Sequence, residues 1–339
     1  MAKKQPKGRN PTTSTFSETT LVGTGLTTIE KLFAHEYFCM VFYFENSFSS
    51  IPKLAGEITR LITMLPDIAP GSGFATPNPS RDRPQPPSKW WPLNERINLS
   101  SITHASNPET ILQIQSLPVD THDFILSCEP AKSPNAYNAS WSVHYAGPTY
   151  NNISLGARLC VTLATEVAAR IGNAKLSSFF CDVALECSKY KECYSGHVEC
   201  APLFEILAGN YYDLIYGFHT TTFDREVNHY AFWDESLDRT RFARDIYMGN
   251  YFGPVLNKVI DPENEFSKEF EGYRVYPWPP TPPHEGKHSV KQFSGGGAYY
   301  SLTNEPLNMS KQFKEYEDEQ AARLGVMLRK RLRERGALL

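Results

Sequence analysis

The feature that most constrains the fold is the run EYFCMVFYFE at residues 36–45, which is almost entirely aromatic and apolar. Aromatic and β-branched side chains favour extended chain, and an apolar run of this length is typical of a strand buried in a sheet. The next segment has helical periodicity, with Ser49 or Ser50 as the cap and Pro52 in the first turn. Its apolar positions are Leu54, Ile58, Leu61, Ile62 and Leu65.

Strand and helix patterns continue along the rest of the chain. Further strands are predicted at residues 90–96, 110–117, 123–128, 140–145, 178–185 and 213–219, and within the glycine-containing segment 291–302. Further helices are predicted from residue 152 or 154 to 172, at 200–207, from 238 through 247, around 255–259, and from 309 or 310 to 335. This pattern predicts an α/β fold of the α+β type, with mixed or mainly antiparallel sheets and helices packed on one face.

Three regions are distinguished by composition. Residues 1–28 are polar and rich in Thr, Ser, Lys and Gly, so we expect a flexible tail. Residues 29–135 form an N-terminal α+β half with a proline-rich exposed loop at 66–89, and residues 136–339 form a C-terminal half that ends in a long charged helix. Both halves begin with a strand, a loop and a helix, which suggests two related halves, although their residues are not similar enough to establish a duplication.

Charge is distributed unevenly along the 339 residues, whose formal net charge is −3. Residues 1–30 have four basic and two acidic side chains and residues 322–339 have six basic and one acidic, so the body between them has a net charge of −10. Binding to phosphates needs clustered Lys and Arg, so an acidic body suits a basic protein partner better than nucleic acid. The cations near the C-terminus complement a helix dipole, and we expect no direct contact with nucleic acid.

The sequence predicts a cytoplasmic protein without membrane contact. The polar N-terminus lacks the apolar core of an export signal, and the longest apolar run is too short to cross a bilayer. The hydrophobic content of 41% is ample for a packed core, so the seven cysteines, an odd number, need not form disulfides.

Two groups of side chains could be taken for metal or catalytic sites. The first comprises Cys181, Cys187, Cys193, Cys200 and His197. It contains no CxxC pair, which structural zinc usually requires, and ordinary core cysteines explain it better. The second comprises His219, Asp224, Glu226 and His229, whose spacing fits no single helical face. The common hydrolase, nucleotide-binding and zinc-protease motifs are also missing, so we expect no catalytic residue, no metal and no cofactor.

The segment 213–254 combines many aromatic residues with many carboxylates. Buried aromatic anchors surrounded by charge are typical of protein–protein interfaces, although a single aromatic residue more often packs in a core. We predict that a partner-binding surface is drawn from this segment. Its candidate residues are Tyr230, Trp233, Asp234, Glu235, Asp238, Asp245 and Tyr247.

The C-terminal third of the chain resembles a known family. The motifs are an aromatic-Trp-acid group (FWDE), then ARDIYMGNYFGP, a glycine-rich strand and an Arg-rich terminal helix. The matching residues are Trp233, Asp234, Ala243, Arg244, Asp245, Ile246, Tyr247, Gly249, Asn250, Tyr251, Gly253, Pro254, Gly296, Gly297, Tyr299, Ser301 and Leu302. This order is similar to the immunity protein 52 family of bacterial polymorphic-toxin immunity proteins, except that Met248 stands where tryptophan is expected.

The resemblance implies a protein that binds and neutralises a cognate toxin of the nuclease class and has no catalytic activity of its own. The acidic body fits this role, since nucleases have basic grooves for phosphate. Two alternatives stay open on the residues alone. One is a metal-dependent enzyme that uses His219, His229 and neighbouring carboxylates, and the other is a scaffold protein whose proline-rich loops recruit partners.

Overall fold

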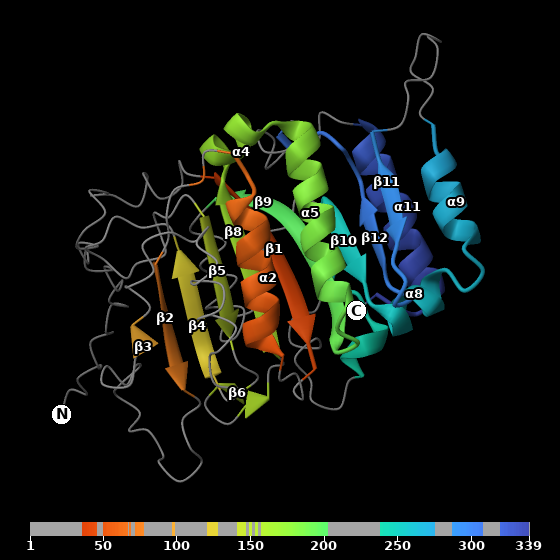
Figure 1. The fold of residues 1–339 in the computed structure, drawn as a ribbon. Helices are drawn as coiled ribbons and strands as arrows, with labels where there is room; N and C mark the ends of the chain where they lie inside the picture. Colours follow the sequence, from red (N-terminus) through yellow and green to blue (C-terminus); the bar gives the residue numbers. More distant parts are fainter. Residues whose placement is uncertain are drawn as a thin grey trace, which may run out of the picture.

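The structure is a computed structural model, and it describes residues 36–45, 50–66, 68, 72–77, 97–98, 121–127, 141–146, 149–150, 153–154, 157–202, 238–274, 287–307 and 319–338. Their main feature is a sheet of ten strands in the order β11-β12-β10-β9-β1-β8-β5-β4-β2-β3, in which every neighbouring pair of strands is antiparallel (Figure 1). The predicted α+β class, with a mainly antiparallel sheet, is therefore confirmed.

The strands of this sheet are β1 (Glu36–Phe44), β2 (Ser72–Pro77), β3 (Ile97–Asn98), β4 (Thr121–Ser127), β5 (Trp141–Ala146), β8 (Ala157–Ala164), β9 (Cys193–Pro202), β10 (Gly249–Phe252), β11 (Ser289–Gln292) and β12 (Ala298–Ser301). A separate small hairpin pairs β6 (Thr149–Tyr150) with β7 (Ile153–Ser154). The helices are α2 (Ile51–Thr63), α4 (Thr165–Ile171), α5 (Asn173–Ser188), the short 3-10 helix η3 (Arg239–Arg241), α8 (Pro254–Ile260), α9 (Glu265–Gly272) and α11 (Glu319–Glu334).

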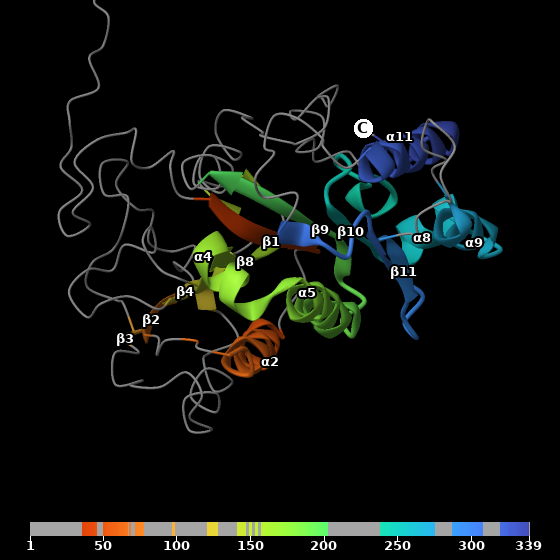
Figure 2. The ribbon, with the colours of Figure 1, turned by 90° about the horizontal axis from the view of Figure 1, so that it is seen from above.

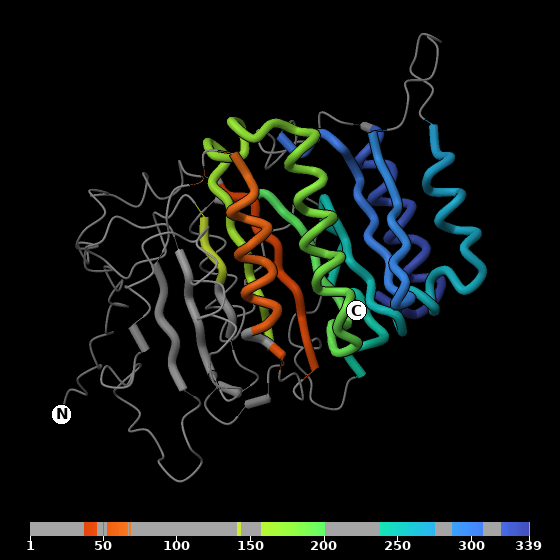
Figure 3. The backbone as a smooth tube through the Cα atoms, viewed as in Figure 1, coloured from red at the N-terminus to blue at the C-terminus, as the bar shows by residue number. Residues whose placement is uncertain are grey.

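The aromatic run at the start of the folded chain forms β1, which lies between β8 and β9 at the centre of the sheet (Figure 3). All its side chains from residue 37 to residue 44 are buried. Phe38 packs against Phe180 of α5 with 5.5 Å between ring centroids, while Tyr43 lies near His197 on the other face of the sheet. A strand that is covered on both faces has no solvent-facing positions, which explains why this run lacks polar alternation.

Helices lie on both faces of the sheet, which corrects the prediction that they pack on one face. α2 and α5 cover one face, and α11 lies on the other (Figure 2). The last helix has one apolar stripe toward the core, because Leu324, Leu328 and Leu332 are fully buried. The sheet also joins the two predicted halves, since β1 pairs with β8 and β9 and β4 pairs with β5. Among the described helices, none is long and apolar enough to cross a membrane.

Two adjacent predictions, at 152–172 and 178–185, are wrong in opposite ways. The segment predicted as a helix begins with the hairpin strand β7 and continues as β8, and only Thr165–Ile171 is helical. The segment predicted as a strand is part of α5. β8 alternates, with Ala157, Leu159, Val161 and Leu163 separated by Arg158, Cys160 and Thr162, but these apolar positions were combined with Val167 and Ile171 into one helical pattern. The predicted stop at Gly172 is confirmed, with a φ of 81° that favours glycine.

Three other predictions need correction. β2 lies inside the segment 66–89 that was predicted to be a loop; it pairs with β4, and its proline is at the strand end, where proline is tolerated. β9 continues to Pro202, so the helix predicted from residue 200 does not begin there. Asp238 does cap a helix, but this helix is the single turn η3, and the chain then extends toward β10.

Candidate functional site

The structure separates the predicted partner-binding residues. Asp238 is exposed, and its carboxylate caps η3 by accepting hydrogen bonds from the backbone N–H of Thr240, at 3.2 Å, and from the Thr240 hydroxyl, at 2.6 Å. Asp245 and Tyr247 are buried, with 4% and 1% of their surface exposed. In this conformation neither can contact a partner directly, which corrects their assignment to the surface. The remaining candidates are Tyr230, Trp233, Asp234 and Glu235, and these lie outside the described residues, as do His219, Asp224, Glu226 and His229.

Asp245 forms a buried ion pair that joins two distant parts of the chain. Nη2 of Arg329 in α11 donates to Oδ1 of Asp245 at 2.6 Å, and the backbone N–H of Ile246 donates to the same oxygen at 2.8 Å. Burial raises the pKa of Asp245, and the positive charge of Arg329 opposes this effect. The side chain of Asp245 is 2% exposed, so its charge depends on this partner.

A cluster of aromatic and cationic side chains lies beside this ion pair, on the same face of the sheet. The ring of His197 in β9 stacks on Tyr247, with 3.8 Å between centroids and 12° between planes. Nη1 of Arg244 donates a 2.8 Å hydrogen bond to the Tyr43 hydroxyl, and its guanidinium carbon lies 5.9 Å from the centre of the Tyr43 ring. Tyr194 stacks against Tyr43 at 6.3 Å. These contacts join the segment after η3 to the centre of the sheet.

Residues 243–250, which we call the anchor segment, are all buried. Asn250 fixes the turn at the end of this segment, because its side-chain amide accepts from the Tyr247 N–H at 2.8 Å and donates to the Tyr247 carbonyl at 2.7 Å. The N–H of Ala243 donates to the carbonyl of Ala337, after α11, at 2.7 Å. Both ends of the anchor segment are therefore fixed by hydrogen bonds, one to the C-terminal end of the chain and one within the turn that leads into β10.

The cysteines considered as metal ligands are not gathered at one point. Cys187 at the end of α5 contacts Cys193 at the start of β9, and burial, together with this neighbour, raises the pKa of Cys193. His197 pairs across the sheet with Val41, and Cys200 with Phe38, which places the two on opposite faces. Within the described residues, no group of three or more His, Cys, Asp or Glu side chains is arranged to hold a metal ion.

Two further ionisable pairs are buried near the centre of the sheet. Nε2 of His197 lies 3.5 Å from Oε1 of Glu199. The thiols of Cys39 in β1 and Cys160 in β8 lie 3.3 Å apart, and the hydrogen bond with Cys160 and burial raise the pKa of Cys39. A raised thiol pKa disfavours the nucleophilic thiolate, and both thiols are buried in the core.

The chemistry available to this cluster is limited by its burial. Burial raises the pKa of Tyr247 well above that of a free tyrosine, so its hydroxyl stays protonated at neutral pH. The hydroxyls of Tyr194 and Tyr247 and Oδ2 of Asp245 are buried and have no hydrogen-bond partner among the described residues. The arrangement stabilises contacts between segments, and it offers no exposed nucleophile paired with a base.

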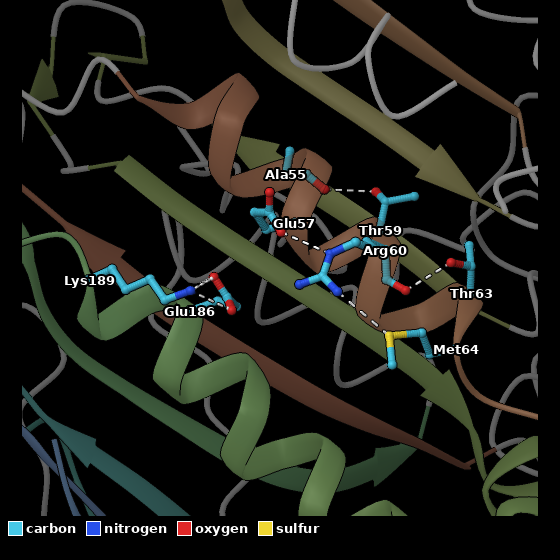
Figure 4. Close-up of polar contacts among 8 residues, drawn as sticks. All are labelled: Ala55, Glu57, Thr59, Arg60, Thr63, Met64, Glu186 and Lys189. Carbon is cyan, nitrogen blue, oxygen red and sulfur yellow. Dashed lines mark hydrogen bonds and ion pairs between the residues drawn. The ribbon is translucent and has the colours of Figure 1, made fainter. Parts of the chain in front are cut away.

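Polar side chains of α2 and α5, on the other face of the sheet, make local contacts. In α2, Nε of Arg60 lies 3.0 Å from Oε2 of Glu57, and Nη1 of Arg60 contacts the sulfur of Met64 at 3.7 Å (Figure 4). In α5, Lys189 contacts both carboxylate oxygens of Glu186 at 2.6 and 2.7 Å. These pairs are three or four residues apart within or at the end of one helix, which is the ordinary pattern of a helix surface.

The residues of the buried cluster are only partly predictable from the sequence. Arg329 was interpreted as a cation near the end of a helix, and its partner Asp245 lies 84 residues earlier in the chain. His197 was considered only as a metal ligand. A periodic pattern reports which face of an element is apolar, and it does not report which two polar residues meet across the fold.

Comparisons with known proteins find a similar fold but no matching family. No protein-family model matches this chain, and no curated protein sequence matches it. Among solved structures, the fold is similar to that of the Pseudomonas aeruginosa T6SS protein PA0821, with a TM-score of 0.50 and 8% sequence identity. The alignment covers 88% of this chain and 72% of that chain. At this identity the likeness is one of fold.

Proposed function

We propose that this chain is an immunity protein that binds a basic toxin of the nuclease class and neutralises it by contact, without catalysis. Two likenesses support the proposal. The segments around residues 233–254 and 296–302 resemble the immunity protein 52 family, and the fold is similar to that of a T6SS protein. Both likenesses are compatible with a role in competition between bacteria.

The observation that carries the proposal is that the acidic and aromatic residues before Asp238 continue directly into the buried anchor segment. The chain that contains Trp233, Asp234 and Glu235 leads directly into Asp238, η3 and the anchor segment. The anchor segment is fully buried and is held by the Arg329–Asp245 ion pair and the His197–Tyr247 stack. A binding segment attached to a fixed base loses less conformational entropy when it meets its partner.

The charge of the chain before Asp238 favours a basic partner. Residues 203–237 contain six acidic side chains and one basic side chain, which gives this stretch a net charge of −5. Nucleases use cationic grooves to hold phosphates, and an acidic surface is drawn to such grooves over long range. Long-range attraction increases the association rate, while buried aromatic residues such as Trp233 contribute most of the affinity.

Neutralising three carboxylates is expected to slow association with the toxin encoded beside this gene. We expect the combined change Asp234→Asn, Glu235→Gln and Asp238→Asn to lower the association rate constant about tenfold at low ionic strength. The difference should shrink toward physiological salt, where the screening length is about 8 Å. Asparagine is also a good helix cap, so the thermal stability should change little. Stopped-flow or surface-based kinetics at several salt concentrations would measure this effect.

A matched control removes the same number of charges from a different surface. The variant Glu57→Gln, Glu166→Gln and Asp182→Asn changes residues of α2, α4 and α5 and should associate at the wild-type rate. Equal slowing of both triple variants would show that only net charge matters and would remove the segment 230–238 from the interface. Failure of the wild-type chain to bind this toxin would reject the proposed function itself.

A further inference from the structure

Helices α9 and α11 lie side by side and antiparallel at one end of the sheet (Figures 1 and 2). Near the start of α9, the guanidinium carbon of Arg331 lies 5.3 Å from the centre of the Phe266 ring, and Nε of Arg331 donates to the Ile260 carbonyl at 2.8 Å. Near the end of α9, His288 contacts the Glu271 carbonyl and the Gln320 side chain, each at 3.2 Å. These contacts place Phe266 level with Arg331, and Glu271 level with Gln320.

The outward side of α9 and of the turn before it is acidic. Glu263, Glu265, Glu269 and Glu271 are all exposed, and the exposed basic residue among them is Lys268. None of these four carboxylates forms an ion pair with another residue of the described chain. Three carboxylates on so short a helix, with a fourth just before it, repel one another, and a cationic surface brought against them would relieve that repulsion.

The outward side of α11 is basic. Arg329 and Arg331 point inward to Asp245 and Ile260. Arg323, Lys330 and Arg333 are exposed, and Lys330 also lies 3.8 Å from the exposed Glu334 of the same helix. Val326 lies between the exposed cations and is 66% exposed. The helix dipole favours cations in the last turn of a helix, and it does not account for the exposed valine among them.

We propose that the paired surface of α9 and α11 binds a second copy of this chain, with α11 of each copy against α9 of the other. A two-fold axis that runs parallel to the two helices and between them places the partner's α9 over α11. The same rotation places the partner's α11 over α9. The acidic side of each α9 therefore faces the basic side of an α11. Charges also match along the helices, since Glu271 lies near the level of Arg323 and Glu265 near that of Arg333.

A second copy explains this surface better than an acidic partner does. A uniformly acidic protein or a nucleic acid would be attracted to α11 but repelled by the glutamates of α9 beside it. A self-complementary surface needs both signs next to each other, with an apolar residue among the charges. Val326 supplies that apolar contact.

Charge reversal on the full-length protein tests this proposal. We expect the wild-type chain to form a dimer at low ionic strength, measured by light scattering after size exclusion or by analytical ultracentrifugation. The α11 variant (Arg323→Glu, Lys330→Glu) and the α9 variant (Glu265→Lys, Glu269→Lys) should each weaken dimerisation at least about tenfold, because like charges then face each other. An equimolar mixture of the two variants should form a heterodimer, since each reversed helix again faces a helix of opposite charge.

Controls separate this surface from general charge effects and from misfolding. Reversing two lysines on α2 and α5, with Lys53→Glu and Lys175→Glu, should leave the dimer intact. Circular dichroism and thermal unfolding would show that each variant is folded. A wild-type monomer at low salt would overturn the proposal, as would a dimer that survives both reversals or a mixture of folded variants that stays monomeric. None of these outcomes bears on binding to a toxin.

Discussion

Replacing Arg329 with methionine should destabilise the fold by about 3–5 kcal/mol at neutral pH, because it leaves a buried carboxylate without its counter-charge. The side chain of Asp245 is 2% exposed and that of Arg329 is 14% exposed, so the remaining charge has little access to water. Methionine preserves much of the apolar stem of arginine, which limits the loss of packing. Urea unfolding of the wild type and the variant would measure the difference in free energy.

The pH dependence of this loss distinguishes an uncompensated charge from a packing defect. Burial already raises the pKa of Asp245, and removing Arg329 should raise it further. A carboxyl group whose pKa is higher in the folded state destabilises the fold above that pKa and ceases to do so when it is protonated. The destabilisation should therefore shrink as the pH falls toward 5.

The matched control is Lys330→Met, which removes the neighbouring exposed cation of the same helix. Lys330 is 3.8 Å from Glu334, and its side chain is 74% exposed. Its loss should change the free energy of unfolding by no more than about 0.5 kcal/mol. If Arg329→Met were as mild as this control at neutral pH, the ion pair with Asp245 would not hold the anchor segment.

Replacing Gly253 with alanine should cost about 3 kcal/mol, because the added methyl group would overlap the backbone of β9. A Cβ atom at this position would lie 2.7 Å from the carbonyl oxygens of both Cys193 and Tyr194. Gly253 also donates its N–H to the Tyr194 carbonyl at 2.9 Å, so the two backbones cannot easily move apart. Thermal or urea unfolding would measure this cost.

Gly272→Ala is the control for this substitution. Gly272 ends α9, and a Cβ atom there would meet nothing within 4 Å. Alanine at this position should be neutral or slightly stabilising, by less than about 1 kcal/mol. A Gly253→Ala variant that unfolds at the same urea concentration as the wild type would show that the close approach of α8 to β9 is wrong.

Elements in which the pattern of apolar residues matches the side chains that are buried could be predicted from the sequence. The predicted ends of β1, α2 and β5 lie within one or two residues of the ends in the structure. The strand predicted within 291–302 is β12, and the three glycines from 295 to 297 lie in the turn that joins it to β11. In each case the local pattern and the final environment agree, which is the condition under which a sequence determines its structure locally.

The errors came from elements whose surroundings are set by distant parts of the chain. β8 lies between β1 and β5 and is buried almost throughout, and its short period-two pattern runs directly into the helix α4, so the two elements were predicted as one helix. α5 was mistaken for a strand because SFFCDVAL is aromatic and contains valine. Its buried positions nevertheless have helical spacing, and a longer window would have shown it. These positions are Leu176, Phe179, Phe180, Val183, Ala184 and Cys187.

The candidate site also depends on distant parts of the chain, which a local sequence pattern does not report. The sequence indicated that residues near 245 matter, but it could not show that Asp245 and Tyr247 point inward. That orientation depends on Arg329 and His197, which come from other elements. Only the tertiary structure reveals that these residues form the base beneath Asp238 and not the contact surface itself.

The central claim is that this chain neutralises a nuclease by binding it, and inhibition of the purified toxin tests this most directly. The catalytic domain of a nuclease toxin identified among the neighbouring genes would be titrated with the full-length chain while cleavage of a DNA or RNA substrate is followed. The proposal predicts that cleavage stops at about one chain per toxin and that the chain alone leaves the substrate intact. Cleavage that continues undiminished in the presence of excess folded chain would contradict it.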